Sequence, residues 1–170
     1  MKIRTATLQD LDAITAIYNN AILTTDATFD TEPKSVKEQR TWFINHDAKH
    51  PLLVAEEGHM VIGWASLSPW SDRCAYRNTA ETSVYVHQER RGKGVGEELL
   101  RAVMDEGEKA GIHTVIALIT ASNEASLNLH RAAGFVHVGT LREVGDKFGR
   151  LLDVYMMQLI FPTTKPKAKL

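Results

Sequence analysis

The sequence feature that most constrains this fold is the glycine-rich segment 91–96 (RGKGVG), which separates two different periodicities. Residues 81–86 before it alternate as a strand does, and residues 97–109 after it have helical spacing. Glycines at such a junction allow bare backbone N–H groups to converge on an anion at the helix N-terminus. Arg91 and Lys93 add positive charge at the same place. The segment therefore predicts a binding site for a phosphorylated ligand, the alternative being a turn that holds none.

The spacing of the glycines narrows the kind of ligand. A dinucleotide-binding loop reads G-x-G-x-x-G, but the third glycine here, Gly96, comes one residue early. An NTPase loop needs Ser or Thr after Gly-Lys, and Lys93 is followed by Gly94. The pattern Arg-x-x-Gly-x-Gly does fit, with Arg91, Gly94 and Gly96 in register, and here the chain resembles the GCN5-related N-acetyltransferases (GNAT family). In that family this turn grips the pyrophosphate of acetyl-coenzyme A (acetyl-CoA).

Composition excludes several other classes of protein. With 170 residues and 44% hydrophobic content, the chain suits one domain, expected at 1–162, followed by a flexible tail at 163–170. A net charge of −1 gives no field that recruits nucleic acid, and no apolar run approaches the roughly 18 residues needed to span a membrane. One cysteine, Cys74, precludes an internal disulfide and indicates a reducing compartment. Without a signal-peptide core after Met1, we expect a cytoplasmic protein.

The seven histidines raise the question of a metal site. His46 and His50 are four residues apart, a spacing that chelates a metal when both stand on a helix. Pro51 and the end of the helix argue against this geometry, and no third ligand is evident. We therefore expect no metal.

Periodicity along the chain predicts an alternating order of helices and strands. Helices are predicted at 8–22, 35–45 and 97–109, and from Asn123 to Gly134. Strands are predicted at the N-terminus and at 52–55, 60–67, 81–86, 114–120, 135–139 and 153–159. The GNAT family has this order of elements. The resemblance implies an α/β (α+β mixed sheet) class and the acyl-CoA N-acyltransferase (GNAT) fold, a central mixed sheet with splayed parallel strands flanked by helices.

Two further motifs stand in the register of the same family. Asn123-x-x-Ser126 is followed by Gly134-Phe135, as in the family's Asn-x-x-Ser…Gly-Phe segment. Asn123 would hydrogen-bond the pantetheine arm there, although a helix-cap role explains it equally well. The resemblance implies that acetyl-CoA is the cosubstrate and that it contacts Val84, Tyr85, Val86, Arg91, Gly92, Lys93, Gly94, Val95, Gly96, Glu97, Asn123 and Ser126.

Acetyl transfer to an amine requires a base, because a primary ammonium has a pKa of about 10.4 and must lose a proton before it attacks. Glu81, at the start of the predicted central strand, occupies the position at which the family commonly has this base. The alternative is a solvated acid at a strand end. Backbone N–H groups of residues 84–86 are expected to stabilise the oxyanion, since the family's pantetheine lies beside this strand.

The departing thiolate needs a proton, and many relatives have a Tyr four residues before the Gly of Gly-Phe. This chain has His130 there, which we assign to the same catalytic role on the strength of the resemblance. The alternative is a structural histidine on a helix.

The acceptor is suggested by closer resemblance to one branch of the family, the phosphinothricin and methionine sulfoximine or sulfone N-acetyltransferases. The segments that carry it are scattered from end to end and include Ala75-Tyr76-Arg77, Glu81-x-Ser83-Val84-Tyr85-Val86-His87 and Val144-Gly145-x-Lys147-Phe148-Gly149-Arg150. The branch acetylates small amino acids that bear a tetrahedral phosphorus or sulfur group. The resemblance implies that the acceptor contacts Phe29, Tyr76, Arg77 and Glu81.

Two other functions stay open on the sequence alone. One is an acetyltransferase of the same fold that modifies a protein N-terminus, a lysine or a polyamine. The other is a catalytically silent regulator that binds acetyl-CoA. The family also suggests a homodimer.

Overall fold

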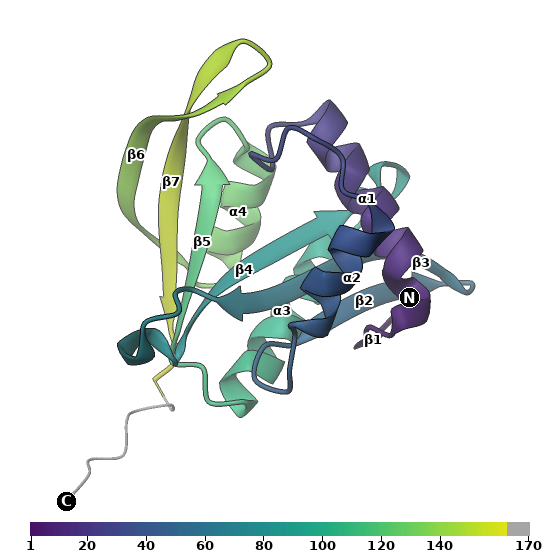
Figure 1. The fold of residues 1–170 in the computed structure, drawn as a ribbon. Helices are drawn as coiled ribbons and strands as arrows, with labels where there is room; N and C mark the ends of the chain where they lie inside the picture. The colour runs from purple at the N-terminus through teal and green to yellow at the C-terminus, as the bar shows by residue number, and fades with distance from the viewer. Residues whose placement is uncertain (163–170) are drawn as a thin grey trace, which may run out of the picture.

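The computed structural model describes residues 1–162, so the tail predicted at 163–170 lies outside the described residues. Within them, seven strands form one sheet (Figure 1). In spatial order they are β1 (Lys2–Thr5), β2 (Leu52–Glu57), β3 (Met60–Pro69), β4 (Thr79–Val86), β5 (Thr114–Thr120), β7 (Arg150–Ile160) and β6 (Val136–Lys147). The helices are α1 (Leu11–Thr24), α2 (Val36–Ile44), α3 (Val95–Lys109) and α4 (Glu124–Ala132). Short 3₁₀ turns occur at η1 (Leu8–Asp10), η2 (Cys74–Tyr76) and η3 (Gln88–Arg90).

The sheet has one parallel junction, and it is incomplete. All neighbouring strands pair antiparallel except β4 and β5, which run parallel. The β4–β5 pairing covers three residue pairs, from Thr79↔Thr114 to Glu81↔Ile116, although both strands continue beyond it. The two strands therefore diverge after Glu81, which confirms the predicted mixed sheet with splayed parallel strands.

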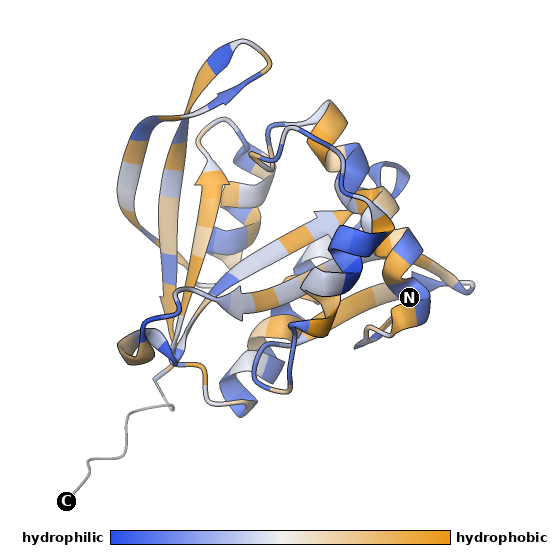
Figure 2. Ribbon diagram, in the orientation of Figure 1, coloured by the Kyte–Doolittle hydropathy of each residue, from blue (hydrophilic) through white to orange (hydrophobic). Residues whose placement is uncertain are grey.

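The helices cover both faces of the sheet (Figure 1). On one face α1 and α2 pack over β2, β3 and β4, where Ile14 and Ile17 contact Val54 and Trp64. On the other face α3 and α4 bury Leu99, Val103 and Leu127 against the sheet. Figure 2 shows β5 as hydrophobic along most of its length, in keeping with a strand covered on both faces. The divergence of β4 and β5 thus opens between two packed layers.

Local signals in the sequence account for the starts of α2 and α3. Ser35 caps α2 and Glu38 completes the predicted capping box, with its carboxylate accepting from the Ser35 N–H at 2.8 Å. Helix α3 begins at Val95, two residues earlier than predicted, because Gly94 takes the left-handed conformation (φ 79°) and serves as the N-cap.

The C-terminal hairpin differs most from the prediction. Strands β6 and β7 are longer than the predicted 135–139 and 153–159 and meet at a tight turn through Phe148 and Gly149, both with positive φ. Irregular pairing between Leu141 and Gly145 breaks the alternation of side chains, so the pattern of the sequence conceals the strand there.

Candidate active site

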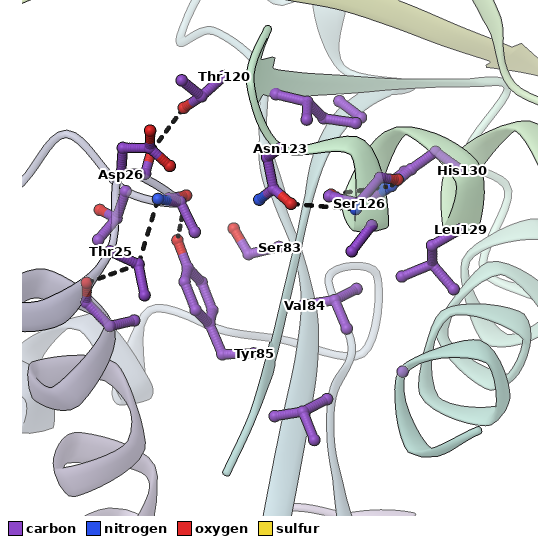
Figure 3. A pocket seen from close by; sticks show the side chains of 18 of the residues that line it. Thr25, Asp26, Ser83, Val84, Tyr85, Thr120, Asn123, Ser126, Leu129 and His130 are labelled. Carbon is purple, nitrogen blue, oxygen red and sulfur yellow. Dashed lines mark hydrogen bonds between the residues drawn. The ribbon is translucent and has the colours of Figure 1, made fainter. Parts of the chain in front are cut away.

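A pocket of about 1130 Å³ lies where β4 and β5 diverge. Its walls come from β4, the glycine-rich segment, β5, the start of α4 and the loop that follows α1 (Figure 3). Of the twelve residues predicted to bind acetyl-CoA, all except Lys93 line this pocket. The Lys93 ammonium donates instead to the Glu89 carbonyl at 3.1 Å. The structure therefore brings Asn123 and Ser126 next to the 84–97 stretch, from which they are about 26 residues distant in the sequence.

The backbone of β4 presents unpaired polar groups to the pocket. His87 donates its N–H to Ile62 of β3, and successive residues of a strand point their backbone groups to opposite edges. The N–H and C=O groups of Val84 and Val86 therefore point toward β5, from which β4 has diverged. The Arg91 side chain donates to the Val86 carbonyl at 3.2 Å, in agreement with this orientation. Such groups suit an extended ligand that carries amides, as pantetheine does.

The glycine-rich segment forms an anion site at the N-terminus of α3. Gly92 and Gly94 have φ values of 71° and 79°, and no side chain caps the helix. The first N–H groups of the helix, including those of Gly96 and Glu97, are consequently available to a ligand. The helix dipole and Arg91 contribute positive charge at this end, whose first turn also carries Glu97 and Glu98. Donors of this kind fit a pyrophosphate, so the described residues fit both halves of acetyl-CoA.

Asn123 has the predicted cap role, and its geometry leaves the predicted ligand-binding role possible. Its Oδ1 accepts the Ser126 N–H at 3.1 Å, which caps α4. Its Nδ2 stays free to donate, and the side chain lies at the pocket wall opposite Ser83 (Figure 3). Capping and ligand binding are therefore compatible.

Glu81 is the last residue of β4 that pairs with β5, and it lines the pocket at the point where the two strands part. It makes no hydrogen bond or ion pair with the described residues. Burial raises its pKa, because the charged form loses solvation and gains no partner. An unpaired carboxylate in this position is a better proton acceptor than an ordinary surface glutamate.

His130 lines the same pocket from α4 and is only 4% exposed. Its Nδ1 lies 2.8 Å from the Ser126 carbonyl oxygen, which can only accept, so Nδ1 carries the hydrogen and Nε2 carries the lone pair. Burial lowers the pKa of the imidazole. This shift favours the neutral ring, a form that cannot donate from Nε2. This geometry favours the structural alternative over the role of proton donor to the thiolate.

The loop after α1 closes the pocket on the side of α1 and α2. Its backbone is held by the Thr120 hydroxyl, which donates to the Asp26 carbonyl at 2.5 Å, and by the Lys147 ammonium, which donates to the Thr28 carbonyl at 2.7 Å. Phe29, predicted to contact the acceptor, lines the pocket, and its ring lies against Gly145, where a Cβ would collide with it. No motif marks Asp26 or Thr120, and the motif that contains Lys147 does not show that its side chain holds this loop.

Two residues predicted to contact the acceptor lie elsewhere. Tyr76 and Arg77 stand at the exposed η2 turn and do not line the pocket. Their contact with the acceptor remains a prediction. Ser83, which the branch motif contains but to which no contact was assigned, does line it, and its side chain shares a face of β4 with Glu81 because strand residues two apart point the same way.

Two negative findings concern the described residues only. Residues 1–162 contain no group of three or more His, Cys, Asp or Glu side chains placed to hold a metal ion. None of the helices among them is long and apolar enough to cross a membrane.

Comparison with known proteins agrees with this site. Residues 3–156 match the acetyltransferase (GNAT) domain family. The chain is 41% identical to the L-amino acid N-acyltransferase of Escherichia coli, with 99% of each chain covered. It is 40% identical to the L-methionine sulfoximine/L-methionine sulfone acetyltransferase of Pseudomonas paraeruginosa, with 96% of each covered. The phosphinothricin acetyltransferase of Sinorhizobium meliloti, solved with acetyl-CoA, superimposes with a TM-score of 0.93 at 36% identity and covers 98% of this chain and 92% of its own.

The chain belongs to the GNAT acetyltransferase family. It is an acetyl-CoA-dependent N-acetyltransferase with the fold that the sequence predicted.

Proposed function

We propose that this enzyme acetylates the α-amine of small amino acids, in particular those with a tetrahedral sulfur or phosphorus group in the side chain. The observation that carries the proposal is the unpaired, half-buried Glu81 carboxylate at the meeting point of the β4–β5 gap and the α1–α2 side of the sheet. The names of the relatives in Escherichia coli and Pseudomonas paraeruginosa support the acceptor class.

The chain's own residues account for the steps that this reaction needs. Acetyl-CoA supplies the activated thioester. Glu81 takes a proton from the acceptor ammonium, directly or through water, and the neutral amine then forms the C–N bond. The N–H groups of Val84 and Val86 stabilise the negative charge that develops on the carbonyl oxygen. The C–S bond breaks as that charge collapses, the nitrogen loses its second proton to give the amide, and the thiolate takes up a proton from solvent.

Glu81→Gln tests the role of the base. We expect turnover to fall by roughly 10²–10⁴-fold while the dissociation constant for acetyl-CoA stays within twofold, since the glycine turn is untouched. Glu106→Gln, an exposed position on α3 whose carboxylate pairs with Lys109, is the matched control and should behave as wild type. Wild-type turnover of Glu81→Gln between pH 6 and 9 would remove Glu81 from the mechanism.

The acceptor class is tested by thiol release from acetyl-CoA across a panel. The panel contains free amino acids, methionine sulfone and sulfoximine, phosphinothricin, peptides with free N-termini, and polyamines. Turnover restricted to free amino acids supports the proposal. Preferred turnover of peptides or polyamines selects the first alternative left open by the sequence, and acetyl-CoA binding without turnover of any amine selects the regulator.

We also propose that the enzyme is a cytoplasmic homodimer. Large apolar side chains are exposed on the edge strand β6 and its partner β7: Val136, Val138, Leu151 and Ile160. A second copy of the chain would cover them, which supports a dimer that forms at this edge. Figure 2 shows apolar segments along both strands of this hairpin. A molar mass of twice 19.0 kDa by light scattering, reduced to one chain by Val138→Lys, is the expected result.

A further inference from the structure

His46 lies in the loop after α2 and has no role in the mechanism above, although its spacing from His50 raised the question of a metal site. The structure directs the two rings to different partners. His50 Nδ1 lies 2.9 Å from the Asp47 carboxylate in the same loop. His46 faces the sheet instead, where its Nε2 lies 3.4 Å from the Ser68 hydroxyl of β3. The His46 ring therefore reaches the strand next to the one that carries the base.

Ser68 stands directly across from Glu81 in the sheet. The antiparallel register of β3 and β4 pairs these two residues, and opposite residues of such a pair project from the same face. Their Cβ atoms are about 4.5–5.5 Å apart, so rotation about one side-chain bond would bring the Ser68 hydroxyl within reach of the carboxylate. Burial is nevertheless the cause of the raised Glu81 pKa, and no hydrogen bond from a described residue opposes it. The neighbour best placed to pair with the base thus leaves it unpaired.

The tautomer of His46 decides where the Ser68 hydroxyl points. His46 Nδ1 lies 3.0 Å from the Trp42 carbonyl oxygen, which can only accept, so Nδ1 carries the hydrogen. In the neutral ring Nε2 then carries a lone pair, and the Ser68 hydroxyl donates to it. Burial lowers the pKa of the imidazole, which favours this neutral form. The one hydrogen of the Ser68 hydroxyl is therefore used on His46 and is not available to Glu81.

Aromatic packing holds the His46 ring in this orientation. The Trp42 ring of α2 lies edge-on to it, with the two centroids 4.6 Å apart. Trp42 packs in turn on Trp64 of β3, with centroids 5.3 Å apart, and Trp64 is buried in the core beneath α1 and α2. The acceptor for Ser68 is thus fixed by the packing of α2 on the sheet.

The direction of this hydroxyl matters for the strength of the base. A hydrogen bond donated to a carboxylate favours its charged form and lowers its pKa. A donor at Glu81 would therefore offset the effect of burial and leave a less basic carboxylate. Keeping the nearby hydroxyl engaged elsewhere preserves the basicity that proton removal from an ammonium requires.

Other titratable groups lie around the base and the imidazole on this side of the sheet. Tyr85 shares the face of β4 that carries the base, and burial raises the pKa of its phenol to about 12. Tyr18 of α1 donates its hydroxyl to the Asp30 carboxylate at 2.6 Å. Asp47 and His50 flank the imidazole in its own loop, and their charges act on its pKa in opposite directions. Helices α3 and α4 cover the other face of the sheet.

We propose that His46 is a positioning residue for the catalytic base: by holding the Ser68 hydroxyl, it prevents that hydroxyl from pairing with the Glu81 carboxylate. The inference rests on the proposed function, in which Glu81 takes the proton from the acceptor ammonium. Neither His46 nor Ser68 lines the large pocket, so His46 acts on the base through Ser68 and not through a substrate.

The direct test is an NMR titration of the Glu81 carboxyl in protein with isotopically labelled glutamate, its resonance assigned by its loss in Glu81→Gln. His46→Phe keeps an aromatic ring beside Trp42 and removes the acceptor, so the Ser68 hydroxyl turns to Glu81. The midpoint of the titration should move to lower pH by about 0.5–1 pH unit, the scale of one hydrogen bond. The acid limb of kcat/KM against pH should move in the same direction, while the acetyl-CoA dissociation constant is unchanged.

Ser68→Ala separates this role from a purely structural one. Without the hydroxyl, nothing turns to Glu81, so both Ser68→Ala and the double variant His46→Phe/Ser68→Ala should titrate as wild type. A structural effect of the His46 change would persist in the double variant. His50→Phe, in the same loop but paired with Asp47, is the matched control and should leave the Glu81 titration unchanged.

The outcomes separate this inference from the proposed function. A Glu81 titration that His46→Phe leaves unchanged or moves to higher pH overturns the inference, and so does a downward shift that survives in the double variant. If His46→Phe does not fold, His46→Leu, which also lacks an acceptor, takes its place. These results leave the proposed function standing wherever Glu81→Gln is impaired. Wild-type turnover by Glu81→Gln refutes the proposed function instead, and the NMR titration still decides whether His46 controls this carboxyl.

Discussion

Gly96→Ala should stabilise the free protein and weaken its binding of acetyl-CoA. Gly96 is the second residue of α3 and has no positive φ, so alanine fits the backbone. A Cβ there would meet Leu129 at 3.5 Å, Val86 at 3.7 Å and Val84 at 4.0 Å, which are ordinary contact distances. Alanine is favoured over glycine in helices by roughly 0.5–1 kcal/mol. At a first-turn position we take the lower value, about 0.5 kcal/mol, which corresponds to a Tm increase of about 1–2 °C for a chain of this size.

The same methyl group occupies space that the ligand needs. Gly96, Val84 and Val86 all line the large pocket, at the place where the glycine turn meets the unpaired backbone of β4. An extra methyl in a filled contact costs roughly 1–3 kcal/mol. That range weakens acetyl-CoA binding by about 5–150-fold. The Tm of Gly96→Ala should therefore lie above that of wild type without acetyl-CoA and below it when acetyl-CoA is in excess, because the variant gains less stability from the ligand.

Calorimetric titration with acetyl-CoA gives the dissociation constant directly. Gly111→Ala is the matched control, because Gly111 follows the other end of α3 with φ of 87°. It should lower Tm through backbone strain and leave acetyl-CoA affinity unchanged. A Gly96→Ala dissociation constant within twofold of wild type refutes the placement of acetyl-CoA along this face of the glycine turn.

Three further predictions concern ionisable side chains in or near the pocket. Burial raises the Glu81 pKa in the folded protein, so wild-type stability declines as pH rises from the ordinary glutamate pKa through the raised one. Denaturant titrations should show that Glu81→Gln gains stability over wild type above this pH range and not below it. His130→Phe should keep turnover within about threefold and leave the pH–rate profile unchanged; a loss above about 100-fold with an altered basic limb would restore the proton-donor role. Lys147→Met should raise KM for the acceptor several-fold without affecting acetyl-CoA binding, because it releases the Thr28 carbonyl. Burial lowers the Lys147 pKa, so wild type gains stability as pH rises toward the ordinary lysine value, and the variant should lack this gain in pH-dependent melts.

The sequence predicted the cofactor side of the site more fully than the acceptor side. The reason is that backbone conformation determines the cofactor side. Glycines at 92 and 94 are needed for positive φ, and alternation along 81–86 fixes which groups face the gap. Both are local properties that a sequence displays directly.

The acceptor side depends on contacts between distant segments, which no local pattern records. Lys147 meets Thr28 across 119 residues, and Thr120 meets Asp26 across 94. Gln39 reads in the sequence as an ordinary polar residue of a helix, and only the packing of α2 on the sheet shows that it is buried. The strands of the β6–β7 hairpin were predicted too short, because its irregular pairing disturbs the period-two pattern of the sequence.

The early end of the β4–β5 pairing has a consequence for the way the enzyme responds to its surroundings. Amides at even positions of β4 beyond Glu81 lack a partner strand, whereas those at odd positions pair with β3. Hydrogen exchange of the free enzyme should therefore alternate residue by residue along one strand, fast at Val84 and Val86 and slow at Tyr85 and His87. Acetyl-CoA should abolish the alternation, because the ligand completes the sheet as an added strand would. Ligand at 100 times its dissociation constant then adds about 2.7 kcal/mol to the unfolding free energy, so the lifetime of the folded enzyme follows the supply of its own substrate.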